Sequence, residues 1–189
     1  MKTRTHIKRL TLTALFTALI FLSTAFIKFP VTLGYVHVGD VFILLASFAL
    51  PPVFSVLSAG VGSALADLLA GYVIYAPVTF VVKGVMALIF SLFIYKKSNL
   101  ARVLLSVLLG SIMMVVSYFI FEGIVYGWGL ALSNIPLQLI QPLVTIILGT
   151  AIVLSLGKIN FVVRLKTEIA LKSHYKYPKE AKKVDEKGI

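Results

Sequence analysis

Four ionisable side chains lie within stretches that are otherwise almost continuously apolar. They are Asp40, Asp67, Lys83 and Glu122. A charge inside a bilayer costs several kcal/mol, so such residues mark a binding site or an ion path by default. Carboxylates accept hydrogen bonds from ring N–H, amino and hydroxyl groups, and a lysine ammonium donates to carbonyl, phenolate or carboxylate oxygens. These residue types favour a site for a small polar ligand.

Neutral polar residues extend these positions into stripes along three predicted helices. In the helix predicted over residues 73–95, Tyr75, Thr79 and Lys83 recur every four residues and share one face. The other two stripes are Tyr118, Glu122 and Tyr126, and Asn134, Gln138, Gln141 and Thr145. Stripes at one depth on three consecutive helices predict a water-filled pocket that is open to the outside. Hydrogen bonds that only hold the helices together are the alternative.

Aromatic residues and a loop histidine complete the predicted substrate site. Tyr72 and Trp128 join the stripe tyrosines as flat faces for stacking. His37 falls in a predicted loop over residues 31–38, where it could help to cap a ligand. The side chains together favour a small, planar, polar heterocycle. The full predicted site is His37, Asp40, Asp67, Tyr72, Tyr75, Thr79, Lys83, Tyr118, Glu122, Trp128, Asn134, Gln138 and Gln141.

The sequence offers little for catalysis or for metal binding. It has no cysteine and three histidines, two of which lie near the chain ends. It contains no nucleotide-binding G-x-x-x-x-G-K-[ST] motif, no H-E-x-x-H zinc motif and no G-x-S-x-G nucleophile motif. We therefore expect no enzyme activity, no catalytic residues, no metal and no cofactor.

The elements that carry these residues are predicted to be membrane-spanning helices. Of the 189 residues, 59% are hydrophobic and 13% are charged, which is about half the ~25% usual for soluble domains. This composition predicts an all-α integral membrane protein with a six-helix transmembrane bundle in residues 1–157 and a basic cytoplasmic tail in residues 158–189. The expected spans are residues 10–29, 39–50, 53–70, 73–95, 100–126 and 134–156. A cleaved signal peptide is the alternative for the first of them.

The distribution of positive charge predicts the orientation. The net charge is +11, and nearly all lysines and arginines fall in the N-terminal arm, near residues 96–102 or in the tail. Because basic loops stay on the cytoplasmic side, the N- and C-termini are both expected in the cytoplasm. Lipid headgroups then account for the charge, and no nucleic-acid partner is expected.

Small residues mark close helix contacts. Those at positions 59–66 are expected to pack inside the bundle. Ala14 and Ala18 lie one turn apart on the first helix, where they allow either internal packing or docking of a partner helix. The sequence leaves these two interpretations of the alanine pair equally open.

Short motifs between residues 37 and 84 resemble the substrate-binding S components of energy-coupling factor (ECF) vitamin transporters, in their riboflavin-transporter-like branch. The motifs are His37-Val-Gly-Asp40, Leu50-Pro-Pro52, Gly60-Val-Gly-Ser-Ala-Leu-Ala-Asp67, Gly71-Tyr72-Val-Ile-Tyr75-Ala-Pro77-Val-Thr79 and Lys83-Gly84. The resemblance implies a multi-pass protein of the bacterial plasma membrane, whose pocket lies among the last three spans beneath a lid formed by the loop after the first.

The same resemblance implies a function and partners. A water-soluble vitamin or precursor, such as hydroxymethylpyrimidine, pyridoxine or riboflavin, would be captured from outside with high affinity. A transmembrane T subunit and two cytoplasmic ATPases would then drive its uptake. Ala14 and Ala18 match the family motif that docks on the T subunit. The alternatives are a stand-alone ion-coupled transporter that uses Asp67 or Glu122 as proton carrier, and a membrane protein with a structural or assembly role.

Overall fold

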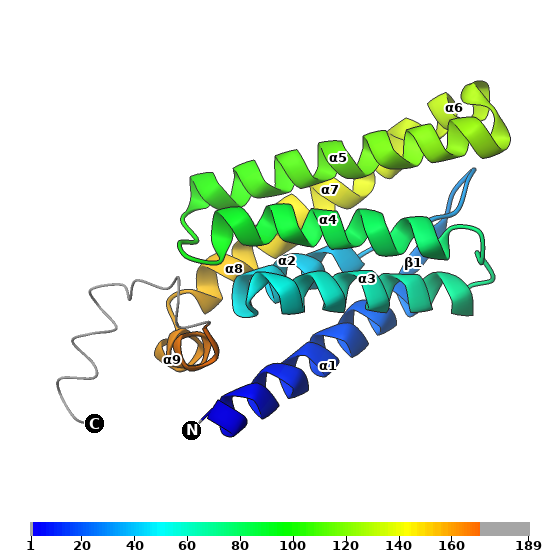
Figure 1. Ribbon diagram of the computed structural model, residues 1–189. Coiled ribbons are helices and arrows are strands. Elements are labelled where there is room, and N and C mark those ends of the chain that lie inside the picture. Colours follow the sequence, from blue (N-terminus) through cyan, green and yellow to red (C-terminus); the bar gives the residue numbers. More distant parts are fainter. Residues whose placement is uncertain (1, 171–189) are drawn as a thin grey trace, which may run out of the picture.

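The long apolar runs of the sequence form the long helices of the computed structural model, which describes residues 2–170 (Figure 1). Four of these helices are single elements: α1 (Lys2–Phe26), α3 (Pro52–Leu69), α4 (Ala76–Ile94) and α5 (Leu100–Tyr126). The fifth long element is an interrupted rod, composed of α6 (Trp128–Gln138), α7 (Ile140–Val144), the π-helical turn η1 (Thr145–Gly149) and α8 (Thr150–Leu156). Within residues 2–170, these five elements are long and apolar enough to cross a membrane.

The second expected span is a short interior helix. Helix α2 covers Gly39–Ala49, and its 11 residues extend roughly 16 Å at ~1.5 Å per residue. A bilayer core is about 30 Å thick, so α2 alone does not cross it. Nearly all its side chains are buried, with Ile43, Leu44 and Ala46 fully enclosed. The described chain therefore has five helices of spanning length, and the six-span count stays a prediction.

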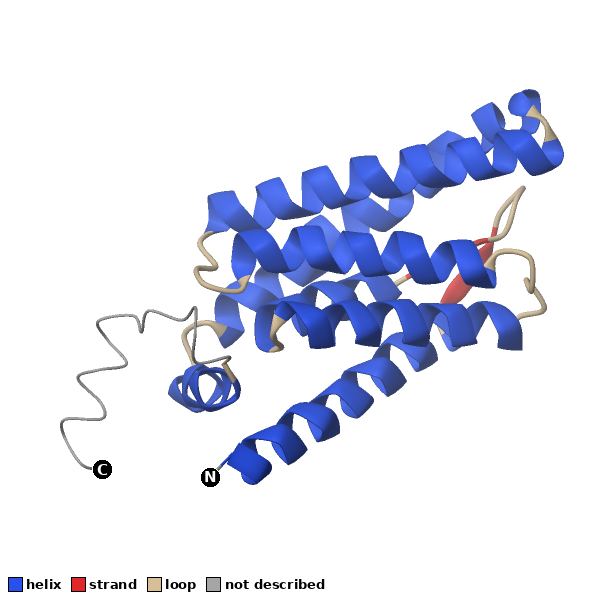
Figure 2. Ribbon diagram, in the orientation of Figure 1, coloured by secondary structure: helices blue, strands red, loops and turns tan. Residues whose placement is uncertain are grey.

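A β-hairpin follows the first helix. Helix α1 ends at Phe26 rather than near residue 29, because β1 (Lys28–Pro30) pairs antiparallel with β2 (Tyr35–His37). The register places Phe29 opposite Val36. Gly34 has φ +82° in the connecting turn, a conformation that glycine adopts without strain. The segment expected to be a loop thus has a fixed strand geometry, which Figure 2 shows in red.

The expected loop before the last span is helical. Only Gly127 separates α5 from α6, with φ +95°, so the chain reverses there without a long connection. Pro136 lies inside α6, and Leu139 interrupts the rod between α6 and α7. The rod begins at Trp128 rather than at the predicted residue 134, and Gly127 marks a turn instead of the start of a loop.

Glycines allow close contact where α3 meets its neighbours. A Cβ on Gly62 would lie 2.8 Å from the carbonyl oxygen of Thr17 on α1, and one on Gly60 would lie 2.9 Å from that of Phe80 on α4. The small residues of α3 therefore pack inside the bundle.

A short amphipathic helix lies at the end of the bundle that is opposite the hairpin. Helix α9 (Asn160–Ile169) runs crosswise to the long helices, beside the start of α1 (Figure 1). The Arg9 guanidinium donates to the carbonyl oxygens of Ile169 and Ala170, at 2.8 and 3.0 Å, and Lys8 pairs with Glu168. The predicted tail therefore begins with a docked helix, and its residues 171–189 lie outside the described chain.

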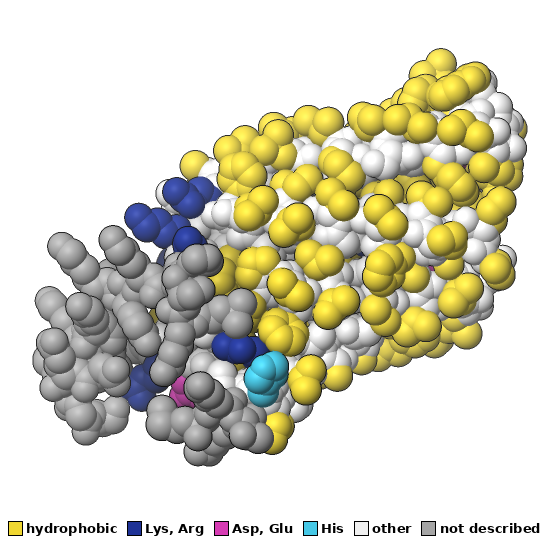
Figure 3. All heavy atoms as spheres, in the orientation of Figure 1, with side chains coloured by type: hydrophobic (Ala, Val, Ile, Leu, Met, Phe, Trp, Pro, Cys, Tyr) yellow, Lys and Arg dark blue, Asp and Glu magenta, His cyan; other side chains and the backbone are white. Residues whose placement is uncertain are grey.

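The surface of the bundle suits a bilayer. Hydrophobic side chains cover the flank of the helices, whereas lysine and arginine gather at the end that carries α9 (Figure 3). Ile124 and Ile147 are 74% and 67% exposed on the described chain. Such a surface needs lipid or partner helices around it.

Candidate functional site

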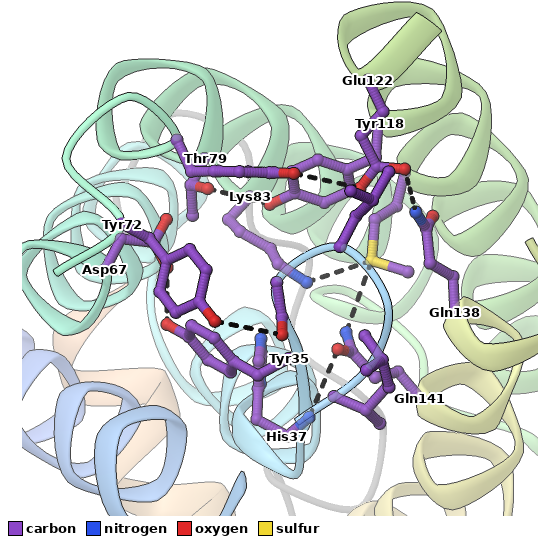
Figure 4. Close-up of a pocket in the computed structure, with 16 residues that line it drawn as sticks. Tyr35, His37, Asp67, Tyr72, Thr79, Lys83, Tyr118, Glu122, Gln138 and Gln141 are labelled. Carbon is purple, nitrogen blue, oxygen red and sulfur yellow. Dashed lines mark hydrogen bonds between the residues drawn. The ribbon is translucent and has the colours of Figure 1, made fainter. Parts of the chain in front are cut away.

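A pocket lies at the hairpin end of the bundle, where the three predicted polar stripes converge (Figure 4). Its walls come from α3, α4, α5, α6 and α7, and the hairpin closes one side. The empty space between the walls, including the mouth, is about 530 Å³, and the cavity itself measures about 50 Å³. The lining residues are Val31, Leu33, Gly34, Tyr35, Val36, His37, Asp67, Tyr72, Tyr75, Thr79, Lys83, Met114, Tyr118, Glu122, Gln138 and Gln141.

A buried ion pair forms the floor of the pocket. Lys83 Nζ lies 2.6 Å from Asp40 Oδ1, and the two side chains are 1% and 4% exposed. Gln141 Nε2 donates to the other Asp40 oxygen at 3.0 Å, and Met114 Sδ lies 3.0 Å from the ammonium. Because α2 starts beneath the pocket, Asp40 at its first turn points directly at α4. The pair joins α2 to α4, and the glutamine adds the rod that carries α7.

A second polar cluster surrounds Glu122 on α5. Asn134 Nδ2 lies 3.0 and 3.1 Å from the two carboxylate oxygens, and Gln138 Nε2 donates to Oε2 at 3.0 Å. The Tyr75 hydroxyl reaches Oε1 at 3.5 Å. Glu122 is 2% exposed. The amide stripe of α6 therefore faces the carboxylate stripe of α5.

The hairpin is bonded to the pocket walls rather than free above them. The Tyr35 hydroxyl donates to Asp67 Oδ1 at 2.5 Å, and the Tyr72 hydroxyl donates to the Gly34 carbonyl at 3.3 Å. The rings of Tyr35 and Tyr72 lie 5.3 Å apart. Burial and the neighbouring carboxylate of Asp67 raise the pKa of Tyr35, so its hydroxyl stays a donor. These bonds hold the hairpin against α3 in the described state.

His37 is neutral in this structure. Burial, and then the positive charge of Lys83, lower its pKa from 6.5 to about 3. Its Nδ1 accepts from the Gly39 N–H at 3.1 Å, and the backbone N–H of His37 donates to Gln141 Oε1 at 3.3 Å. Because Nδ1 is an acceptor, the ring proton lies on Nε2, which is available as a donor. His37 can thus offer one hydrogen bond but no positive charge.

The structure brings most of the predicted site residues to one cavity. His37, Asp67, Tyr72, Tyr75, Thr79, Lys83, Tyr118, Glu122, Gln138 and Gln141 line it. Asp40 and Asn134 lie one layer behind, where they hold Lys83 and Glu122. Trp128 does not line the pocket. Its indole is 56% exposed and packs on Gly123 and Phe119 instead, because α6 already begins there and turns that side chain outward.

One interpretation of the charges changes with the structure. Lys83 is paired with Asp40, so its ammonium is not a free cation for the ligand. Tyr35 and Met114 line the pocket although the sequence analysis did not select them. Each had a signal: Tyr35 alternates with His37 on one strand face, and Met114 precedes Tyr118 by four residues on the α5 stripe.

The alanine pair of α1 does not line this pocket and lies on an exposed face of the helix. Ala14 and Ala18 are both exposed, with Leu15 52% exposed between them. The described bundle therefore does not bury the strip, which makes internal packing of the pair the weaker of the two interpretations.

Comparisons with known proteins point to one family. Residues 4–158 match the family model described as ECF-type riboflavin transporter, S component. A protein of Lactococcus lactis subsp. cremoris (strain MG1363), called thiamine precursor transporter HmpT, is 31% identical over 147 residues, which cover 76% of this chain and 84% of that protein. An uncharacterized protein in the gap 3'region of Pyrococcus woesei is 36% identical over 123 residues, covering 65% of this chain and 82% of the relative.

The family match covers most of the chain, and the apolar helices agree with it. The resemblance of the sequence motifs is thereby confirmed, and the protein is a multi-pass protein of the plasma membrane rather than a member of an enzyme family. The chain belongs to the family of S components of ECF-type riboflavin transporters.

Proposed function

We propose that this chain captures a small, water-soluble, heteroaromatic vitamin or vitamin precursor from outside the cell. The observation that carries the proposal is the polar pocket at the hairpin end, which is the end opposite the basic residues. The positive-inside rule assigns the basic end, with the start of α1 and with α9, to the cytoplasm. The pocket then faces the outside, and the hairpin is its lid. Hydroxymethylpyrimidine, pyridoxine and riboflavin are the candidate ligands.

We propose that delivery requires a T subunit and two cytoplasmic ATPases, as in the family, because the sequence contains no nucleotide-binding G-x-x-x-x-G-K-[ST] motif of its own. The exposed strip of Ala14 and Ala18 supports a docking role for α1, since small residues allow a partner helix to approach closely.

Reconstitution in liposomes tests this function. The chain alone should bind its vitamin without ATP and should accumulate none of it. Co-reconstitution with the T subunit and the ATPases should give uptake that stops when ATP is omitted. Uptake by the chain alone, driven by a pH gradient, would refute the proposal and favour an ion-coupled transporter that uses Asp67 or Glu122.

A further inference from the structure

We propose that the ligand of this pocket is a single six-membered heteroaromatic ring with an amino group, which donates N–H hydrogen bonds to Glu122. The inference rests on the proposed function and names the class of vitamin precursor that the pocket selects. It predicts weaker binding of a fused tricyclic ligand, although the family is named after one.

Glu122 is held in its ionised form by the groups around it. Every hydrogen bond that it makes in the described chain comes from a donor: Asn134, Gln138 and Tyr75. The orientation of the Asn134 amide is fixed from behind, because its oxygen accepts from the Leu33 N–H at 3.4 Å. A protonated carboxyl would need an acceptor for its hydrogen, and the fixed Asn134 amide offers an N–H group instead. These donors favour the carboxylate form of Glu122 against the burial that disfavours it.

This anion has no cation of its own in residues 2–170. The two ion pairs there join Lys83 to Asp40 and Lys8 to Glu168. His37 is neutral, as shown above. A carboxylate that is 2% exposed and lacks a counter-charge is costly, since buried charges are normally paired. A ligand that brings N–H donors, or a positive charge, would recover this cost.

The carboxylates of the pocket also disfavour an anionic group beside Glu122. The Lys83 ammonium is committed to Asp40 at 2.6 Å. Lys28 Nζ lies over the Tyr35 ring of the hairpin, 4.8 Å from its centroid, so it can meet an anionic group at the hairpin but does not pair with Glu122. The part of the ligand that lies against Glu122 is therefore uncharged or protonated and carries no phosphate.

A second acceptor lies beside Glu122. Gln138 Oε1 is buried and has no hydrogen-bond partner in the described chain, while the other end of the same amide donates to Glu122. Adjacent acceptors on Glu122 and Gln138 match a ligand edge with two donors. An exocyclic amino group next to a ring nitrogen has this form once the ring nitrogen takes a proton from solution, and each of its two N–H groups can then meet one of these acceptors.

The volume limits the number of rings. The closed cavity, about 50 Å³, is smaller than the cavity of about 150 Å³ that accommodates benzene. One substituted ring therefore needs a small expansion of the pocket beside the flat faces of Tyr75 and Tyr118. Three fused rings would need the hairpin to move away from Asp67 and Tyr72.

Calorimetric titration of the purified chain tests the inference with a matched pair of probes. The first is hydroxymethylpyrimidine with its amino group, and the second is the analogue in which an oxo group replaces the amino group. The amino compound should bind at least about 100-fold more tightly, because the oxo oxygen would face a buried carboxylate. Riboflavin should bind more weakly than the amino compound.

The variant Glu122→Gln should reduce the preference for the amino compound to less than about tenfold, since an amide can either donate or accept. Glu168→Gln, which removes a carboxylate from α9 outside the pocket, should keep the full preference. If Glu122→Gln does not fold, the wild-type comparison still decides.

Equal affinity for the two pyrimidines, or tighter binding of riboflavin, would overturn the inference. Both results would leave the proposed function intact, because a vitamin would still bind and the liposome assay would still report ATP-dependent uptake. Absence of binding by all three probes, together with uptake that needs no ATP, would overturn the inference and the proposed function together.

Discussion

The buried pair of Lys83 and Asp40 makes a prediction that can be followed through a double-mutant cycle. Both side chains are almost completely enclosed, at 1% and 4% exposure. Lys83→Met leaves the Asp40 carboxylate with the Gln141 amide as its remaining partner. Removing one member of such a pair costs about 3–5 kcal/mol, because the other charge stays buried and uncompensated. Asp40→Asn should cost a similar amount, since the ammonium then keeps only a thioether and a neutral amide.

The double variant is the decisive member of the cycle. With Met at 83 and Asn at 40, neither charge remains, and replacing a buried pair by neutral groups is often close to neutral for stability. We expect the double variant to unfold no more easily than either single variant, which gives a coupling free energy of at least about 3 kcal/mol. Equilibrium unfolding in mild detergent measures all four proteins.

Two results would refute this reasoning. Losses that add within about 0.5 kcal/mol would show that the side chains are not coupled. Alternatively, the double variant could recover stability but not ligand affinity. Lys83 would then contact the ligand directly, contrary to its commitment to Asp40.

Three further predictions follow from other contacts. Gly39→Ala should destabilise the chain by about 1–3 kcal/mol and weaken ligand binding, because the added Cβ would overlap Thr24 Oγ1 and lie 2.9 Å from His37 Nδ1. Thermal unfolding should show this loss of stability and should show none for the control Gly129→Ala, whose Cβ meets nothing within 4 Å. Burial lowers the pKa of Lys166 from 10.5 to about 7. Between these pH values the unfolded chain binds more protons than the folded chain, so the free energy of unfolding should rise with pH across that window. Lys166→Met should remove the rise, and a rise that persists in this variant would assign it to another group. Ala14→Trp with Ala18→Trp should leave vitamin binding intact and abolish copurification with the T subunit and ATPases, whereas retained assembly would exclude docking through this strip.

The polar stripes could be predicted from sequence because of the background on which they lie. In an apolar helix, polar residues at four-residue intervals must share a face, whatever the tertiary structure. Tyr118 and Glu122 on α5 therefore predicted a polar wall, and Gln138 and Gln141 predicted another. Their convergence on one pocket needed only the assumption that polar faces avoid lipid.

The partners of the charged residues could not be predicted in the same way. Asp40 and Lys83 are 43 residues apart in the chain, and their contact depends on α2 lying inside the bundle with its first turn beneath the pocket. The composition of residues 39–50 is the same in both cases, since an enclosed helix and a lipid-exposed helix are both apolar all round. Length was the available signal, because 11 residues are too few to cross a bilayer.

The same limit applied to the segments between the helices. The strands of the hairpin have three residues each, which is too short for an alternating pattern to stand out from a loop. Gly127, Trp128 and Gly129 have the composition of a turn, yet the turn needs Gly127 alone and the helix resumes at Trp128. In both places, local composition was outweighed by contacts with distant residues, such as Tyr35 with Asp67 and Asn134 with Leu33.

These distant contacts also connect the lid to the wall that holds Glu122. Asn134 donates to the Leu33 carbonyl in the hairpin turn and, through the same nitrogen, to both oxygens of Glu122. A ligand that donates hydrogen bonds to the Glu122 carboxylate competes with the Asn134 amide for its oxygens. Because the same amide also bonds to Leu33, a shift of Asn134 away from Glu122 would change the contact that holds the hairpin. Ligand binding and the position of the hairpin are therefore linked through one side chain. The residue that the sequence analysis placed in a polar stripe thus lies behind the pocket, where it joins the binding group to the lid.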